Sequence, residues 1–275
     1  MRVVELDGQG QPRLAEAPAP ASALHVLACG LCGSDLEKLG AAPEGTVLGH
    51  EVVAQRADGV RLALIHHLPC ARCERCLAGH ESTCDHFAAA TIVPGGFADE
   101  VSAPGGIELP ADVNDAIGTY VEPLACVLRG AAKVPRGRVL VVGQGFVGRL
   151  FAEVLRHRGD IVFARDIRPE RDGRSPDGPV NALVLCAPAA PLEAVSPGGT
   201  VLVFAPVGSI DLDAVYRKEL TLVGSRSATP AAMREAAALL PKLELPEPTV
   251  LPLARFAEGL ELYRSGRALK VVFTP

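Results

Sequence analysis

Four cysteines stand close together in one short segment: Cys70, Cys73, Cys76 and Cys84. Four thiolates at this spacing can surround one tetrahedral zinc ion and leave no open coordination position, which is typical of a structural site. An iron–sulfur cluster or unliganded surface cysteines are the alternatives, and nothing else in the sequence indicates electron transfer. The spacing therefore favours structural zinc.

A second group of possible metal ligands is scattered along the chain and contains Cys32, His50 and either Glu51 or Glu122. Catalytic zinc takes three protein ligands and keeps one position open for water or substrate. Taken alone, Cys32 is more often a small core residue, and with Cys29 it could form a C-x-x-C redox pair. A dinucleotide-binding unit later in the chain favours the zinc interpretation.

That unit begins with an apolar run at 139–142, followed by Gly143, Gly145 and Gly148 at G-x-G-x-x-G spacing. The run predicts a buried strand, the next dozen residues predict an amphipathic helix, and 161–164 predicts a second strand that Asp166 closes. Glycines let a pyrophosphate approach the helix N-terminus, and an acid at this position can bind a ribose 2′-hydroxyl and repel a 2′-phosphate. The segment predicts an NAD-binding βαβ unit, with a glycine-rich turn in another α/β domain as the alternative.

The composition narrows the class of protein. The chain has 275 residues, of which 48% are hydrophobic, and a net charge of -5, so it can form one large or two ordinary domains. It shows no basic patch for nucleic acid, no apolar run long enough to cross a membrane and no signal-peptide pattern. Eight cysteines without an export signal predict a cytoplasmic protein with metal-bound thiols rather than disulfides.

The motifs C-G-S-D, G-H-E, the four-cysteine segment, E-P-L and G-x-G-x-x-G follow one another in this order. With its closing segment, the chain resembles the zinc-dependent medium-chain alcohol dehydrogenases, and the E-P-L form is similar to their polyol, sorbitol, threonine and glucose dehydrogenase branch. The resemblance implies an α/β fold: a β-rich GroES-like catalytic domain (1–118 and 229–275) and a Rossmann NAD-binding domain (119–228). It also implies two zinc ions and NAD per chain, a small alcohol or ketone substrate, and a homodimer or homotetramer.

The resemblance implies roles for individual residues. Cys32 and His50 would hold the catalytic zinc with Glu51 or Glu122, and the four-cysteine segment would hold the structural zinc. Ser34 would accept the substrate's proton, and Asp35 would orient the ligand histidine. Glu37 stands where many members have a relay histidine, so either it accepts the proton or the proton leaves through water. The predicted cofactor contacts are Gly143, Gly145, Phe146, Val147, Gly148, Asp166, Arg168 and Lys270.

The chain also departs from the family pattern. The interval from His50 to Cys70 is short, and residues 167–179 are too rich in charge, Pro and Gly for a helix or strand. The third strand of the Rossmann sheet is therefore predicted to be missing, which leaves five parallel strands and a looser adenine pocket. Strand three is an edge strand, so its loss does not divide the sheet. Charged residues at the new edge (Asp160, Arg165 and Asp166) are expected to discourage pairing.

The sequence thus predicts a zinc-dependent NAD(H) oxidoreductase that interconverts an alcohol and its ketone or aldehyde. By the resemblance, the backbone of 205–207 and 224–226 would hold the nicotinamide carboxamide, and Thr91 and Ile92 are candidate substrate-pocket residues. The substrate is left open among polyols, sugars, amino alcohols and simple secondary alcohols. The alternative is a non-catalytic, regulatory zinc- and nucleotide-binding protein, which the trimmed segments and the missing relay histidine would suit.

Overall fold

The computed structural model describes residues 1–86 and 92–275. The chain divides into two compact units. The first contains Met1–Pro123, Ala228–Pro241 and Glu247–Pro275, and the second contains Leu124–Ser227 and Lys242–Pro246. The division into functional domains at 1–118 with 229–275 and at 119–228 stays a prediction.

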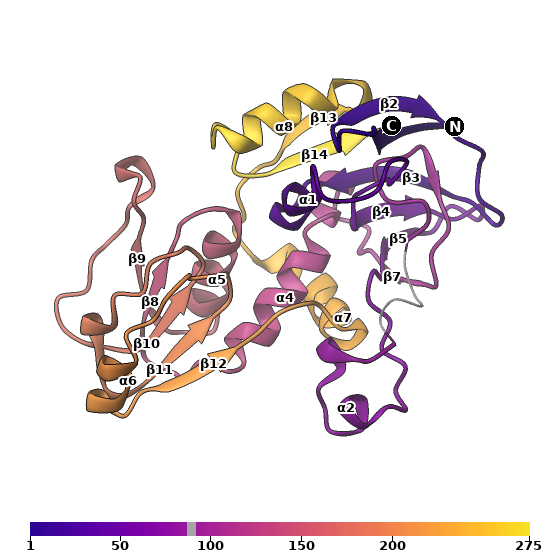
Figure 1. The fold of residues 1–275 in the computed structure, drawn as a ribbon. Coiled ribbons are helices and arrows are strands. Elements are labelled where there is room, and N and C mark those ends of the chain that lie inside the picture. The colour runs from indigo at the N-terminus through magenta and orange to yellow at the C-terminus, as the bar shows by residue number, and fades with distance from the viewer. Residues whose placement is uncertain (87–91) are drawn as a thin grey trace. The chain divides into compact units, whose positions relative to one another are not determined.

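The first unit is built on a seven-stranded sheet whose strand order is β13-β14-β3-β4-β5-β7, with β6 paired to β3. Both chain ends contribute to this sheet, because β14 pairs antiparallel with β3 (Figure 1). A separate hairpin of β1 and β2 completes the strands. The strand bounds are β1 Arg2–Leu6, β2 Pro12–Glu16, β3 Leu24–Gly30, β4 Glu51–Gln55, β5 Arg61–Leu64, β6 Glu100–Val101, β7 Gly106–Glu108, β13 Thr249–Pro252 and β14 Val271–Thr274.

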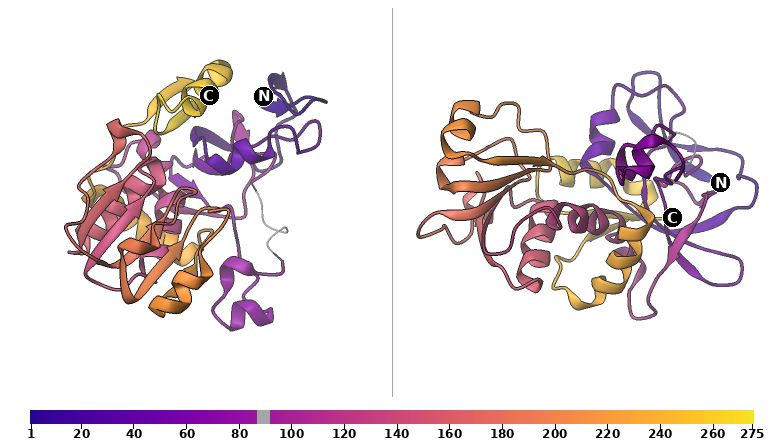
Figure 2. Two further views of the ribbon diagram at one scale, coloured as in Figure 1. Left: turned by 60° about the vertical axis from the view of Figure 1, so that its left-hand side comes forward. Right: turned by 90° about the horizontal axis from the view of Figure 1, so that it is seen from below.

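The helices of the first unit are short. They are α1 Gly33–Lys38, α2 Glu74–Leu77, α3 Asp115–Gly118, α7 Pro230–Leu239 and α8 Phe256–Arg264. Thr229 caps α7 by accepting a hydrogen bond from the amide of Ala232, and Pro230 fills the first helical position. In Figure 1 and in the left view of Figure 2, the loop that carries α2 stands apart from the strands of the sheet.

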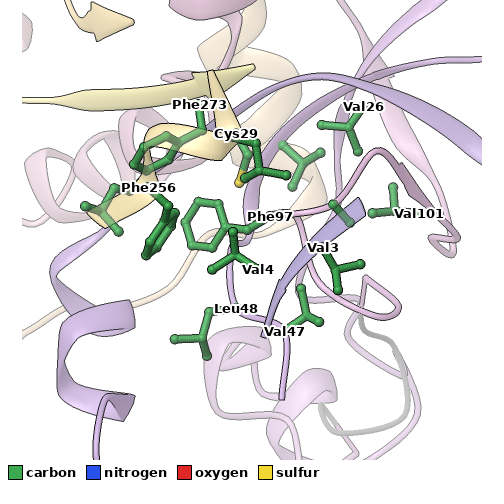
Figure 3. Close-up of a cluster of buried hydrophobic side chains, with 14 of the residues drawn as sticks. Val3, Val4, Val26, Cys29, Val47, Leu48, Phe97, Val101, Phe256 and Phe273 are labelled. Carbon is green, nitrogen blue, oxygen red and sulfur yellow. The ribbon is translucent and has the colours of Figure 1, made fainter. Parts of the chain in front are cut away.

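Three phenylalanines anchor the C-terminal segment in the core of the first unit (Figure 3). The ring of Phe97 meets those of Phe256 and Phe273 edge-on, at centroid distances of 4.9 and 5.6 Å. Phe256 and Phe273 stack on each other at 4.6 Å. Aromatic pairs in these arrangements are each worth about 0.5–1.5 kcal/mol beyond burial. They fix α8 and β14 against the segment around Phe97, whose carbonyl accepts a hydrogen bond from the amide of Val4 on β1, and so help to place Lys270 beside β3.

The second unit contains a parallel sheet of five strands in the order β12-β11-β10-β8-β9. The number of strands confirms the predicted loss of one strand. The elements are α4 Val121–Ala131, which begins in the first unit, β8 Arg138–Val142, α5 Phe146–His157, β9 Ile161–Arg165, β10 Val180–Leu185, β11 Val195–Val203, α6 Leu212–Lys218 and β12 Thr221–Gly224. β11 begins at Val195, where its pairing with β10 starts, and its register then shifts around Pro197, Gly198 and Gly199.

The chain itself shields the edge strand β9. The segment after Asp166 forms one 3-10 turn, Pro169–Arg171, and then returns so that the amide of Ala164 donates to the carbonyl of Arg174. The guanidinium of Arg174 lies over the buried ring of Phe163, 5.2 Å from its centroid, and that of Arg138 lies 4.7 Å from the same centroid.

The expected role of Asp160 at this edge is wrong. Its carboxylate is buried, and it accepts hydrogen bonds from the amide of Gly137 and from Arg158 Nε. The covering segment, rather than charge at Asp160, shields β9 from another strand.

Candidate active site

Two adjacent strands bring the first ligand group together. Cys32 follows β3 and is the N-cap of α1, whereas His50 and Glu51 stand at the start of β4. Gly30 pairs directly with Glu51 across the two antiparallel strands. Ligand atoms of Cys32, His50 and Glu51 consequently lie within 4.8 Å of one another, close enough to share one metal ion.

Asp35 links the short helix to the histidine. Its carboxylate accepts hydrogen bonds from the amides of Cys32 (3.0 Å) and Gly49 (3.3 Å), and its Oδ1 lies 3.3 Å from His50 Nδ1. The first of these bonds also caps the start of α1. Since Nδ1 is held by a carboxylate, Nε2 of His50 is available to a metal.

The electrostatics fit a cationic ligand. Burial alone would raise the pKa of Asp35, but hydrogen bonds from His50 and from the two amides lower it. Burial would lower the pKa of His50, yet the hydrogen bonds to Asp35 and Cys32 raise it well above its usual value. Asp35 and Cys32 therefore stabilise positive charge at the imidazole of His50, whether that charge is a proton or a metal ion.

Glu51 is shared between this group and Lys270. Lys270 is 2% exposed; its Nζ donates to the carbonyl of Leu31 (3.0 Å) and to Oε2 of Glu51. The predicted contact of Lys270 with a cofactor is untested and stays a prediction. Glu122 is buried in α4 and does not belong to the group of three ligand atoms. The geometry thus favours Glu51 as the third group, and ligation by Glu122 stays a prediction.

The two residues predicted to move protons lie on α1 in different surroundings. Ser34 is half-buried, and its Oγ donates to Cys32 Sγ at 3.4 Å, so its hydroxyl lies beside the ligand group. Glu37 is exposed to solvent on the same helix. Its role as a proton acceptor stays a prediction.

Sequence reasoning overlooked His66. Its ring centroid lies 4.9 Å from that of His50 and 4.2 Å from that of His67. Burial, followed by the nearby His50, lowers the pKa of His66 to about 3, so the ring is neutral at pH 7. The His66–His67 pair shortly before Cys70 was the available signal. Of the two candidate pocket residues, Ile92 is buried in the hydrophobic core and Thr91 lies outside the described residues.

The four-cysteine segment forms the second ligand group. The sulfur atoms of Cys70, Cys73, Cys76 and Cys84 lie within 4.8 Å of one another. The amide of Cys73 donates to Cys70 Sγ and the amide of Cys70 to Cys84 Sγ, each at 3.3 Å. Amide hydrogen bonds from Asp85 and Cys76 lower the pKa of Cys73 to about 6, which favours the thiolate that zinc requires. All eight cysteines of the chain are free thiols.

The three glycines of the nucleotide motif differ in their surroundings. Gly143 follows β8 with a φ of +90°, and Gly145 is the N-cap of α5 with open space around it. A Cβ on Gly148 would lie 1.7 Å from the carbonyl oxygen of Gly143, so only glycine lets α5 pack this close to the loop. Beside these glycines, Phe146 is buried and Val147 is half-buried at the start of α5.

Asp166 stands at the carboxyl end of β9 and is tied to this loop. Its Oδ2 accepts from the amide of Gln144 at 2.5 Å, and its Oδ1 accepts from the amide of Arg168 at 2.8 Å. Both bonds hold the carboxylate beside the glycine turn, where an acid can select a ribose hydroxyl. The cofactor contacts predicted for these residues are consistent with this arrangement and stay predictions.

Comparison with known proteins identifies the class. Residues 21–111 match the family model described as the alcohol dehydrogenase GroES-like domain. The chain superposes on a cobalt- and zinc-bound thermostable alcohol dehydrogenase from Pyrobaculum aerophilum with a TM-score of 0.86 and 19% identity, covering 100% of this chain and 99% of that one. The fold is therefore that of the medium-chain dehydrogenases: a GroES-like domain with a Rossmann-type parallel sheet.

Two relatives with known names are similar to this chain in sequence. The chain is 27% identical to a sorbitol dehydrogenase of Halalkalibacterium halodurans, over 98% of this chain and 97% of that protein. It is 29% identical to the L-galactonate-5-dehydrogenase of Escherichia coli strain K12 over 57% of its own length, and that match spans about half, 52%, of the relative. Residues 21–111 thus match the alcohol dehydrogenase GroES-like domain, and nearly the whole chain is similar to a sorbitol dehydrogenase.

Proposed function

We propose that the protein is a zinc-dependent NAD(H) oxidoreductase that interconverts a secondary alcohol and its ketone. The proposal rests on one observation. The ligand atoms of Cys32, His50 and Glu51 lie within 4.8 Å of one another, and Oδ1 of Asp35 lies 3.3 Å from Nδ1 of His50. A thiolate, an imidazole and a carboxylate are a ligand set suited to zinc. When bound, the zinc would supply Lewis acidity and the nicotinamide would accept the hydride.

The chain's own residues have separate tasks in this reaction. Asp35 holds the imidazole of His50 in the orientation that presents Nε2. The hydroxyl of Ser34, beside Cys32, is placed to take the proton that leaves the substrate hydroxyl. From Ser34 the proton passes to solvent, either through the exposed Glu37 or through water.

We infer that the substrate is a polyol or a sugar-derived alcohol. The relatives that support this inference are named sorbitol dehydrogenase and L-galactonate-5-dehydrogenase. Polar groups beside the ligand group, namely the hydroxyl of Ser34 and the neutral imidazole of His66, suit a substrate that carries further hydroxyls.

We propose two zinc ions per chain and NAD rather than NADP. The two groups of ligand atoms support the metal count, one with four thiols and one with three mixed ligands. Asp166 supports NAD, because its carboxylate at the end of β9 would repel a 2′-phosphate. A titration that showed tighter binding of NADPH than of NADH would contradict the assignment to NAD.

We also propose a homodimer or homotetramer in the cytoplasm. β12 is an edge strand of the second sheet, and Leu222 on it is partly exposed, so a second copy could extend the sheet there. Free thiols at both ligand groups suit a reducing compartment. Among the described residues, no helix is long and apolar enough to cross a membrane.

The experiment is a substrate panel with NAD and NADP, in which formation of the reduced cofactor is followed by absorbance. The panel contains acyclic polyols, cyclic polyols, sugar acids, threonine and simple secondary alcohols, and zinc per chain is measured on the same sample. We expect turnover with polyols or sugar-derived alcohols, and about two zinc ions per chain. No turnover together with only one zinc per chain would favour a non-catalytic, regulatory protein instead.

A further inference from the structure

A tyrosine of the last helix is fixed on the core of the first unit. Tyr263 stands in the last turn of α8, and its half-buried ring packs against the core cluster that contains Phe97 and Phe273. A Cβ on Gly259 would lie 2.4 Å from Cζ of Phe273, so glycine at this position lets α8 lie close against β14. The position of Tyr263 is therefore set by the packing of α8 on β14.

The hydroxyl of Tyr263 lies beside the start of α1. Its oxygen is 3.7 Å from the point that a Cβ on Gly33 would occupy, and Gly33 directly follows Cys32 in the chain. Apart from the chain neighbours of Gly33 and the backbone of its own helix, no other atom of the described residues lies within 4 Å of that point. Because glycine has no side chain, the space beside this hydroxyl, next to Cys32, is left open.

The protein leaves this hydroxyl without a partner. Among the described residues, no group forms a hydrogen bond with the hydroxyl oxygen of Tyr263. Burial raises the pKa of Tyr263, and negative charge at Cys32, Glu51 and Asp35 raises it further, so the hydroxyl is protonated at neutral pH and lies near the first ligand group. A hydroxyl both donates and accepts, and both capacities are available to a bound molecule.

Two hydroxyl groups thus lie near Cys32, one on Ser34 and one on Tyr263. In the proposed function, Ser34 serves the substrate hydroxyl that reacts. A polyol carries further hydroxyls, and each of them gives up hydrogen bonds to water when it enters the site. A protein group that pairs with one of these hydroxyls offsets that loss, and it favours polyols over alcohols with a single hydroxyl.

We propose that Tyr263 determines specificity, because its hydroxyl binds a non-reacting hydroxyl of a polyol substrate beside Cys32. Phenol and alcohol hydroxyls can each donate or accept, so the pair can form in either direction. Tyr263 takes no part in the transfer of the hydride or the proton. The inference rests on the proposed function, because it takes the bound molecule to be an alcohol that reacts at the first ligand group.

The test compares two variants in which tyrosine is replaced by phenylalanine. Tyr263→Phe removes the hydroxyl and keeps the ring. The matched control is Tyr216→Phe, because Tyr216 on α6 is 82% exposed. For both variants and the wild type, kcat/KM is measured at saturating NAD with the best polyol of the panel and with its deoxy analogues, each of which lacks one non-reacting hydroxyl. The affinity for NADH and the unfolding midpoint are measured on the same samples.

We expect Tyr263→Phe to lower kcat/KM for the polyol about tenfold, the effect of one lost hydrogen bond. In the wild type, one deoxy analogue should be poorer than the polyol by about the same factor, and Tyr263→Phe should use that analogue within about twofold of the wild type. Since the hydroxyl has no partner in the chain, Tyr263→Phe should keep the unfolding midpoint and the NADH affinity of the wild type. Tyr216→Phe should behave like the wild type in every measurement.

Four results would overturn the inference. If Tyr263→Phe uses the polyol as well as the wild type does, the hydroxyl does not meet the substrate. If it loses the same factor with every deoxy analogue, the residue acts on the ligand group rather than on a second hydroxyl. Weaker binding of NADH by Tyr263→Phe would place the hydroxyl against the cofactor instead. A wild type whose best substrate carries only one hydroxyl would leave Tyr263 nothing to bind.

Failure of the proposed function has a different signature. A wild type that turns over no alcohol of the panel refutes the enzyme itself, and the role of Tyr263 falls with it. In each of the four results above, the wild type still oxidises an alcohol, so the proposed reaction stands and only the role of Tyr263 is lost.

Discussion

Alanine in place of Gly145 or Gly148 should separate cofactor binding from folding. A Cβ on Gly148 would lie 1.7 Å from the carbonyl oxygen of Gly143, about half of an ordinary contact distance of 3.4–4 Å. At Gly145 the same atom would meet nothing within 4 Å, and the φ of -67° suits any residue. The first change therefore strains the fold, whereas the second only adds a methyl group at the N-terminus of α5.

The magnitudes follow from these contacts. In Gly148→Ala, α5 and the loop at Gly143 must move apart until the Cβ–O distance has about doubled. A backbone displacement of this kind costs about 3 kcal/mol of stability. That loss lowers the unfolding midpoint by roughly 6–12 °C for a chain of this size. Gly145→Ala should cost less than about 1 kcal/mol of stability. Its methyl group stands where the diphosphate must meet the helix amides, so the Kd for NADH should rise at least about tenfold.

Thermal unfolding without ligand and titration with NADH read out the two effects separately. We expect Gly148→Ala to lose stability, and Gly145→Ala to keep its midpoint within about 3 °C while binding NADH poorly. If Gly145→Ala bound NADH like the wild type, the diphosphate would not lie at this turn. An unchanged midpoint for Gly148→Ala would show that the close approach of α5 to Gly143 is absent in solution.

Three further predictions concern the metals and the sheet edge. Cys84→Ser should lower the zinc content by about one ion per chain, measured by mass spectrometry after gel filtration; unchanged content would contradict the four-cysteine site. Zinc affinity at the Cys32–His50 site should fall as the pH drops below the raised pKa of His50, because metal binds only the neutral imidazole; chelator competition that is independent of pH would argue against this ligand. Arg174→Ala should destabilise the chain by about 0.5–1 kcal/mol in urea unfolding, since it uncovers Phe163, and no loss of stability would contradict that contact.

Much of the second unit could be predicted because its signals are local. A glycine turn between an apolar run and an amphipathic helix defines a βαβ unit, and the lack of any apolar period at 167–179 shows that a strand is missing. The path of that irregular segment has no such signal. Its return along β9, with Arg174 over Phe163, depends on tertiary contacts that no periodicity encodes.

The sequence likewise could not reveal how the first ligand group, which contains Cys32 and His50, is brought together. Cys32 and His50 are distant in sequence and meet because β3 and β4 pair, which the spacing alone does not reveal. Lys270 reaches Glu51 only because β14, from the other end of the chain, pairs with β3. Without that pairing in view, the sequence suggested only a cofactor contact for Lys270. His66 was overlooked because a histidine pair in a loop has many possible roles.

The central claim is that a metal held by Cys32 and His50 acts on the substrate. Its most direct test is the steady-state rate of NADH formation with the best alcohol of the panel, for the wild type and Cys32→Ser at matched concentrations of protein and zinc. We expect turnover by the wild type and a loss of at least about a thousandfold in Cys32→Ser, the scale of losing the main electrostatic stabilisation of a reaction, with NADH affinity unchanged. Turnover by Cys32→Ser close to that of the wild type would contradict the account.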